Sequence, residues 1–315
     1  YVITPDSNEL DSDSERKRAA LLYPGELTLK YDANVSAAAA GNLTVVYIPY
    51  KVPDYNSYDN EYRRYWSDSW SARECVVLGG SVNTAAHTIT VPFSRTGFGT
   101  YAVFNVNREF TDIKDTWARN YVLPLWAKGV MEKLGANEKF NDAPNKPITR
   151  EEFTVAIVKA MGIPVESGLQ NPFRDVNSKY LEIDKHDDYI LTASKNGIIN
   201  GFPESGGTYF HPEKGLSREE AATIIARVAN LKVSDSETVT AAAMEKAFKD
   251  FDPDKPDNFS AWATPYIYAA YKAGFIQGIP VGNDNKEFVF NPRGKLTRTE
   301  AAKLIYVLMQ KEKKL

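Results

Sequence analysis

The sequence predicts an α+β multidomain chain, with a small N-terminal β-sandwich over residues 1–107 followed by an all-α bundle of three repeats over residues 108–315. Short runs of β-branched and aromatic residues, separated by Gly, Pro, Asn and Asp, fill the N-terminal region and are typical of a sandwich. In the C-terminal region a short helix-start phrase recurs three times, which indicates internal repeats. Because a helical hairpin cannot bury both of its faces alone, we expect the repeats to pack around a shared centre.

The N-terminal region contains five predicted strands, each a short run of residues with high β propensity. They are Glu26–Tyr31, Leu43–Ile48, Cys75–Leu78, Thr88–Val91 and Tyr101–Val106. The tyrosine-rich and charge-rich stretch Asp54–Trp70 has no clear period and is predicted to be a long loop.

The recurring phrase consists of a hydroxyl residue, an arginine, any residue and a glutamate. It occurs at residues 149–152, 217–220 and 297–300. This spacing predicts a capping box at the start of a helix, with the glutamate as a cap. Apolar residues at helical spacing follow each phrase and predict one buried face of a second helix.

Each repeat also begins with an aromatic residue two positions before an aspartate and continues into a first helix. The three first helices are predicted to end near Gly129, Gly197 and Gly274. The long connection of the third repeat is predicted to run from Asn230 to Lys246. The resulting repeat boundaries are 108–165, 166–232 and 233–315.

The arginines of the phrase, Arg150, Arg218 and Arg298, are the candidate functional residues. Each stands at the first position of its helix, where the positive end of the helix dipole disfavours a cation, so capping does not explain it. A guanidinium at a helix N-terminus suits an anionic ligand such as a carboxylate or phosphate. The alternative is a surface ion pair with a nearby Asp or Glu.

Composition limits the other function classes. The chain has 315 residues, a net charge of −3 and 12% aromatic residues. This charge gives no reason to expect nucleic acid as a partner. No apolar run is long enough to span a membrane, so we expect no membrane insertion. The single cysteine, Cys75, forms no internal disulfide. Since the chain begins at Tyr1 without a signal peptide, we expect a piece of a longer protein.

No catalytic or cofactor-binding motif occurs, and we therefore predict no enzyme and no cofactor. The acidic stretch with Asp252, Asp254 and Asp257 is similar to a calcium loop. Pro253 and Pro256 interrupt that pattern and its terminal glutamate is missing, so we predict no metal site.

The C-terminal region resembles the S-layer homology family. The motifs that carry the resemblance are the turns Gly197–Gly201 and Gly274–Gly278, the Phe-x-Pro loops Phe210–Pro212 and Phe290–Pro292, and the three helix starts. The first repeat departs from the pattern, because Lys133 replaces the second glycine of the turn and its loop has two more residues before proline. The second repeat has Lys185 where the others have tryptophan.

This resemblance implies a pseudo-threefold bundle whose grooves bind secondary cell wall polymer, often through a pyruvylated amino sugar. It also implies a secreted protein, held without covalent bonds on the cell wall or S-layer of a Gram-positive-type bacterium. A pyruvate ketal carries a carboxylate, which agrees with an arginine receptor.

Further ligand-binding candidates have simpler alternative roles. Three aspartates would bind sugar hydroxyls or cap the first helix: Asp112, Asp175 and Asp250. Trp117 and Trp262 would stack on the glycan or fill the core. Lys185 would be a second cation for the same anion. Gly201 and Gly278 would offer backbone N–H groups, or simply supply a positive φ at a turn.

Two other functions remain open from the sequence. The repeats could mainly self-associate with other S-layer subunits and bind glycan weakly or not at all. Residues 1–107 could instead belong to an enzyme, although the absence of a catalytic constellation argues against this.

Overall fold

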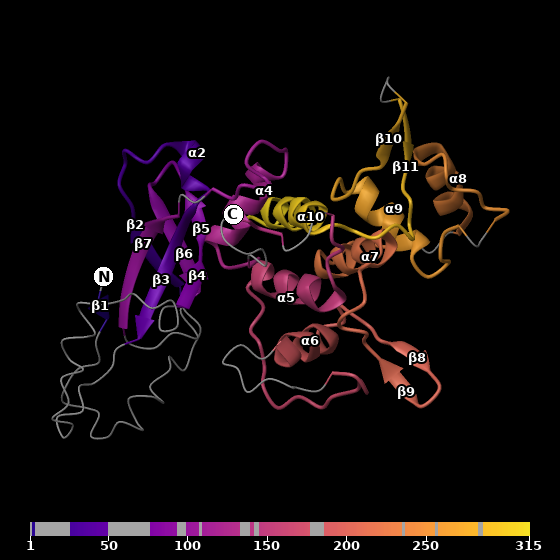
Figure 1. Cartoon of the computed structure of the whole chain (residues 1–315), viewed down its shortest axis with the longest axis horizontal. Coiled ribbons are helices and arrows are strands. Elements are labelled where there is room, and N and C mark those ends of the chain that lie inside the picture. The colour runs from indigo at the N-terminus through magenta and orange to yellow at the C-terminus, as the bar shows by residue number, and fades with distance from the viewer. Residues whose placement is uncertain are drawn as a thin grey trace. The chain divides into compact units, whose positions relative to one another are not determined.

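The computed structural model describes residues 2–3, 26–49, 76–92, 99–106, 109–132, 139–141, 145–176, 186–234, 237–255, 258–282 and 286–315. The chain divides into two compact units (Figure 1). The first unit comprises residues 1–109, 123–132 and 315, and the second comprises residues 110–122 and 133–314. The Asp54–Trp70 loop, Cys75, Lys185 and Asp257 lie outside the described residues.

Two antiparallel sheets form the first unit. One has the strand order β1-β7-β3-β4 and the other has the order β2-β6-β5. Strands of the first sheet are β1 (Val2–Ile3), β7 (Gly99–Asn105), β3 (Leu43–Pro49) and β4 (Val76–Gly79). Those of the second are β2 (Glu26–Lys30), β6 (Thr88–Pro92) and β5 (Ser81–Asn83). A short helix, α2 (Ala37–Ala40), precedes β3.

Both sheets contribute to one apolar core in the first unit. Leu29, Ile89 and Val91 come from the β2–β6 pair, and Val45 and Tyr101 come from β3 and β7. All five side chains are at most 1% exposed. Because side chains alternate across a strand, the residues between them face the other side of each sheet.

Each repeat of the C-terminal region contains a first and a second helix, as predicted. The first helices are α4 (Arg119–Ala127), α6 (His186–Lys195) and α9 (Thr264–Lys272). The second helices are α5 (Arg150–Met161), α7 (Arg218–Val228) and α10 (Arg298–Lys311). Gly129, Gly197 and Gly274 follow the first helices with φ values of 67°, 68° and 72°, the left-handed conformation that glycine adopts without steric cost.

The prediction of an all-α bundle is wrong, because the repeats are mixed α/β. A hairpin of β8 (Phe202–Glu204) and β9 (Gly207–Tyr209) follows α6, and a hairpin of β10 (Ile279–Val281) and β11 (Glu287–Val289) follows α9 (Figure 1). These strands are too short for an alternating pattern to stand out beside the helical stripes. The structure also has a helix that was expected to be a connection, α8 (Glu237–Ala247).

The repeats meet at a closed ring of three backbone hydrogen bonds. The N–H of Ile148 donates to the carbonyl of Leu296, that of Leu296 to Leu216, and that of Leu216 to Ile148, each at 2.9 Å. These residues are at most 1% exposed and directly precede the three helix-start phrases. The ring therefore brings the starts of α5, α7 and α10 together at the centre of the second unit.

Candidate binding grooves between the repeats

All three predicted capping boxes are present at the starts of the second helices. The hydroxyls of Thr149, Ser217 and Thr297 accept from the backbone N–H three residues later, and the glutamates return to the N-cap N–H. The glutamates are Glu152, Glu220 and Glu300. The capping prediction is confirmed, and it fixes where each arginine leaves its helix.

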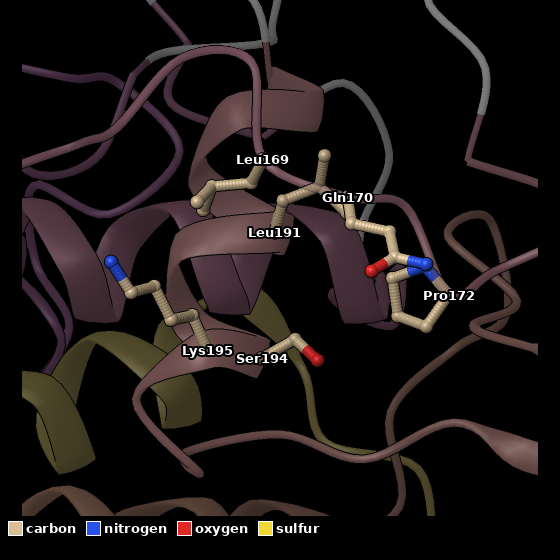
Figure 2. A pocket seen from close by; sticks show the side chains of 6 residues that line it. All are labelled: Leu169, Gln170, Pro172, Leu191, Ser194 and Lys195. Carbon is tan, nitrogen blue, oxygen red and sulfur yellow. The ribbon is translucent and has the colours of Figure 1, made fainter.

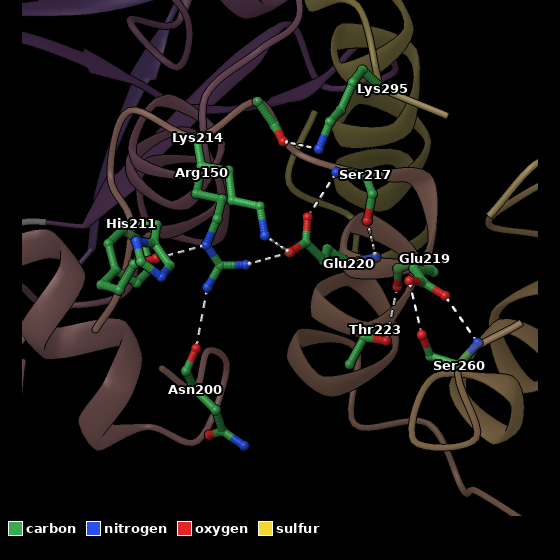
Figure 3. Close-up of polar contacts among 12 residues, drawn as sticks. Arg150, Asn200, His211, Lys214, Ser217, Glu219, Glu220, Thr223, Ser260 and Lys295 are labelled. Atoms are coloured by element: carbon green, nitrogen blue, oxygen red, sulfur yellow. Dashed lines mark hydrogen bonds and ion pairs between the residues drawn. The ribbon is translucent and has the colours of Figure 1, made fainter. Parts of the chain in front are cut away.

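Each arginine side chain crosses to another repeat. Arg150 Nε donates to the Phe210 carbonyl at 2.8 Å, Nη2 donates to the Asn200 carbonyl at 3.1 Å, and Nη1 lies 3.4 Å from Glu220 Oε1 (Figure 3). These three partners belong to the second repeat. Arg150 is 4% exposed, so its guanidinium joins repeats 1 and 2 from inside the protein.

The other two arginines follow the same rule. Arg218 donates from Nε to the Phe290 carbonyl at 2.8 Å, and its Nη1 lies 3.6 Å from Glu300. Arg298 Nη1 lies 3.1 Å from Glu152 Oε1. Repeat 1 thus reaches repeat 2, repeat 2 reaches repeat 3, and repeat 3 reaches repeat 1. We name the three inter-repeat junctions, where the grooves were predicted, the 1→2, 2→3 and 3→1 grooves after these contacts.

Burial disfavours the charged form of two of these arginines. It lowers the pKa of Arg150 and Arg218, while nearby carboxylates raise it in partial compensation. Glu220 and Asp175 do this for Arg150, and Glu300 and Asp250 for Arg218. Arginine remains protonated in proteins, so Arg150 contributes a buried positive charge to the 1→2 contact and Arg218 a partly buried one to the 2→3 contact.

The three candidate aspartates hold the loops of their own repeats. Asp112 accepts the backbone N–H groups of Phe140 and Asn141 at 2.8 and 2.9 Å. Asp175 does the same with residues 210 and 211, and Asp250 with residues 290 and 291. The carbonyls of Phe210 and Phe290 in these loops accept from the arginines, so the aspartates of the second and third repeats position an arginine partner.

Trp117 and Trp262 are exposed aromatic surfaces. Their exposed fractions are 53% and 49%, which is high for tryptophan. Trp117 has the ring of Tyr121 beside it at 6.0 Å between centroids. Neither indole fills the core, so the alternative role is wrong, and stacking on a ligand stays a prediction.

Gly201 and Gly278 have a steric role. The expectation of a positive φ is wrong, because neither residue is in the left-handed region. A Cβ on Gly201 would lie 2.7 Å from Phe173 Cε1 and would also collide with the Thr208 side chain. A Cβ on Gly278 would lie 2.6 Å from Phe288 Cβ. Both glycines allow the hairpins to approach the turn closely.

A cavity of about 300 Å³ opens in the 3→1 groove. It brings together three predicted residues that are distant in sequence: Asp112, Trp117 and Arg298. Of the remaining lining residues, Thr297 and Thr299 belong to the repeated helix-start phrase, and the others were not predicted as ligand-binding residues. These others are Ile113, Thr116, Ala118, Lys139, Asn141, Asn145 and Lys146.

A second depression, of about 400 Å³, lies against α6 (Figure 2). Leu169, Pro172 and Leu191 make it largely apolar, and none of the predicted ligand-binding residues lines it. Its cation, Lys195, pairs with Glu166. Gln170 and Ser194 are the other polar residues of its lining.

Among the residues that the structure describes, no group of three or more His, Cys, Asp or Glu is arranged to hold a metal ion. Asp252 instead pairs with Lys255 at 2.9 Å. Within the same described ranges, no helix is long and apolar enough to cross a membrane.

Comparison with known proteins agrees with this arrangement. Residues 109–154, 172–222 and 257–302 match the S-layer homology domain. The chain is 33% identical over 234 residues to an amylopullulanase of Thermoanaerobacterium thermosulfurigenes, a match covering 74% of this chain and 11% of that protein. It is 32% identical over 206 residues to an exoglucanase of Acetivibrio thermocellus, covering 65% and 17% of the two chains.

The chain is also 30% identical over 160 residues to the S-layer protein Sap of Bacillus anthracis, covering 51% of this chain and 16% of that protein. It therefore spans less than a fifth of the length of these relatives. The three repeats belong to the S-layer homology domain family, as their motifs predicted. Such domains bind cell-wall polymers in general, and the repeats form a module for attachment at the cell surface.

Proposed function

We propose that the repeats anchor a larger surface protein by binding an anionic secondary cell wall polymer in grooves between repeats, through a pyruvylated amino sugar. The observation that carries this proposal is the 3→1 cavity, where Arg298, Lys139 and Lys146 lie with a half-exposed tryptophan. Three cations and one carboxylate line this cavity, so an anion is favoured over a cation.

The chemistry of such a sugar fits these side chains. The ketal carboxylate would lie against the lysines and the positive field of Arg298. The apolar face of the pyranose would stack on Trp117. Both oxygens of Asp112 already accept backbone N–H groups, so the carboxylate supports the loop while Asn141 and Thr299 offer polar groups to the sugar.

The proposed location is the wall or S-layer of a Gram-positive-type bacterium. The relatives include both polysaccharide-degrading enzymes and S-layer proteins, which share this region as a small fraction of their length. We therefore propose that the repeats provide attachment without catalysis, and that residues outside this chain determine whether the attached protein degrades glycans or builds a lattice.

Co-sedimentation with purified sacculi tests this function. Binding should be strong to sacculi that retain their secondary polymer and should disappear after acid extraction removes it. Persistent binding to extracted sacculi would indicate peptidoglycan as the receptor and contradict the proposal. Released polymer added in solution should compete with the sacculi.

Self-association is a second candidate function, favoured by an apolar edge on the β10–β11 hairpin. Ile279 and Val281 on β10 are 38% and 42% exposed. Exposed strand edges with apolar side chains can pair with another chain. Light scattering without any wall material tests this: growth of particles with concentration, abolished by Val281→Lys, would support a lattice role.

A further inference from the structure

We infer that the three grooves are not equivalent: the 3→1 groove takes the anionic sugar, and a glutamate directly after the helix-start arginine closes the other two. The inference rests on the proposed anchoring function and assigns it to one groove. The residue that follows the arginine is Glu151 in repeat 1, Glu219 in repeat 2 and Thr299 in repeat 3.

In the 2→3 groove, Glu219 reaches Ser260 of the next repeat, four residues before α9 begins. Its carboxylate accepts from the Ser260 backbone N–H at 3.2 Å and from the Ser260 hydroxyl at 3.0 Å (Figure 3). Glu219 is 7% exposed. A buried negative charge thus bridges the two walls of this groove.

In the 1→2 groove, Glu151 does the same with a different partner. Its Oε1 lies 2.6 Å from Nδ1 of His186, the first residue of α6. This bridge joins the start of a second helix to the first helix of the next repeat. Two grooves therefore have a glutamate bridge that starts from the same helix-start position and ends at different positions of the next repeat.

The 3→1 groove has no glutamate at this position. Thr299 is shorter, and its hydroxyl lies 3.3 Å from the hydroxyl of Thr297 in its own helix start. Thr299 lines the cavity of about 300 Å³ together with Thr116 and Trp117. The space that a glutamate would bridge is part of this cavity.

Two lysines of the 3→1 groove also distinguish it from the other two grooves. Its lining residues Lys139 and Lys146 precede Phe140 by one position and Arg150 by four. At the matching positions of the 2→3 groove stand Val289 and Gly294, which are uncharged.

The matching residues of the 1→2 groove are Tyr209 and Lys214. Lys214 lies 3.7 Å from Glu220, so its charge is partly neutralised. Only the 3→1 groove therefore has two lysines at these positions of the sequence.

These differences select against an anionic ligand in the glutamate-bridged grooves. A ligand carboxylate that approaches a glutamate meets electrostatic repulsion, which grows as solvent is excluded. Trp262 stands at the position of Trp117 in the third repeat and is nearly as exposed, so the third repeat has a matching aromatic surface. Selection between these grooves thus depends on the residue after the arginine and on the lysines.

Isothermal titration calorimetry of the full chain tests the inference. The probes are polymer released from sacculi by acid, and the methyl glycoside of a pyruvylated N-acetylhexosamine. We expect one glycoside per chain. Thr299→Glu, which installs the residue of the other two grooves, should weaken binding about tenfold or more. Thr299→Gln has nearly the same size without the charge and should weaken binding less.

The matched control is Thr84→Glu, which adds the same charge on an exposed turn of the first unit and should leave affinity unchanged. The converse variant Glu219→Thr should open a second site and raise the stoichiometry to two, and that site should be weaker because it lacks the two lysines. Thermal unfolding confirms that each variant is folded.

The outcomes separate the inference from the function. If Thr299→Glu binds as tightly as the parent, or the parent binds two or three glycosides, the assignment to one groove is wrong while anchoring stands. If Thr299→Gln weakens binding as much as Thr299→Glu, the electrostatic basis is wrong. If the parent binds neither probe, the anchoring function itself fails.

Discussion

The two units of this chain bury a cation in different ways. Arg150 in the second unit is 4% exposed and is bonded to two carbonyls and a glutamate. Lys128 in the first unit is 5% exposed and donates to the carbonyls of Gly80 and Leu43. Within the described residues, no carboxylate pairs with it. The repeats are therefore joined by pairs of opposite charge, in which each member compensates the burial of the other. In the first unit Lys128 is buried without such a partner in the part of the chain that the structure describes, and burial lowers its pKa instead.

The largest expected effect comes from removing the paired cation. Arg150→Ala leaves Glu220 buried with less compensation and leaves two carbonyls without donors. We expect a loss of about 3–5 kcal/mol in the free energy of unfolding of the second unit. Urea denaturation measures it. A loss below about 1 kcal/mol would show that this contact does not hold repeats 1 and 2 together.

The second-largest effect is a pH dependence of stability caused by Lys128. Burial lowers the pKa of Lys128 from 10.5 to about 8. Between these values the folded chain binds fewer protons than the unfolded chain, so stability rises with pH across this window and the cost of burial is fully present below about pH 8. The shift corresponds to about 3 kcal/mol. Calorimetric unfolding of the first unit should show this rise, and Lys128→Met should remove it. An identical pH dependence in the variant would contradict the assignment.

A smaller effect should follow from neutralising the carboxylate while keeping its shape. Glu220→Gln retains an acceptor for the Ser217 N–H and loses the charge opposite Arg150. We expect a loss of about 1–2 kcal/mol in unfolding free energy. Glu300→Gln is the matched variant, because Glu300 faces Arg218 in a more exposed pair. A larger loss for Glu300→Gln would show that burial does not govern the strength of these pairs.

The smallest effect is expected for a solvent-exposed pair of the same unit. Lys195 and Glu166 have side chains that are 53% and 45% exposed. Lys195→Ala should change stability by at most about 0.5 kcal/mol, and high salt should abolish the difference. A loss comparable to that of Arg150→Ala in urea denaturation would remove the distinction between buried and exposed pairs.

Local features of this molecule were predictable from sequence because their partners lie close along the chain. The capping boxes depend on residues three positions apart, and the glycines after the first helices depend on their own φ. The family motifs were recognisable for the same reason. The strand segments that the structure describes also fall close to their predicted positions.

Features that depend on distant contacts were missed. The carbonyl that accepts from Arg150 Nε belongs to a residue 60 positions later, so the sequence alone did not indicate that the arginine crosses to the next repeat. Lys139 and Lys146 enter the candidate site only because the 3→1 contact brings them to the start of α10. The β-hairpins were missed because three-residue strands carry almost no periodic signal.

The ring of hydrogen bonds between Ile148, Leu216 and Leu296 has a mechanical consequence. In an open repeat array, an end repeat can detach while the others keep their contacts. Here every repeat has a neighbour on both sides, so losing any one of them breaks two of the three bonds of the ring. A protease or a pulling force therefore cannot shorten this module gradually. The attachment has a fixed size of three repeats and is either whole or lost.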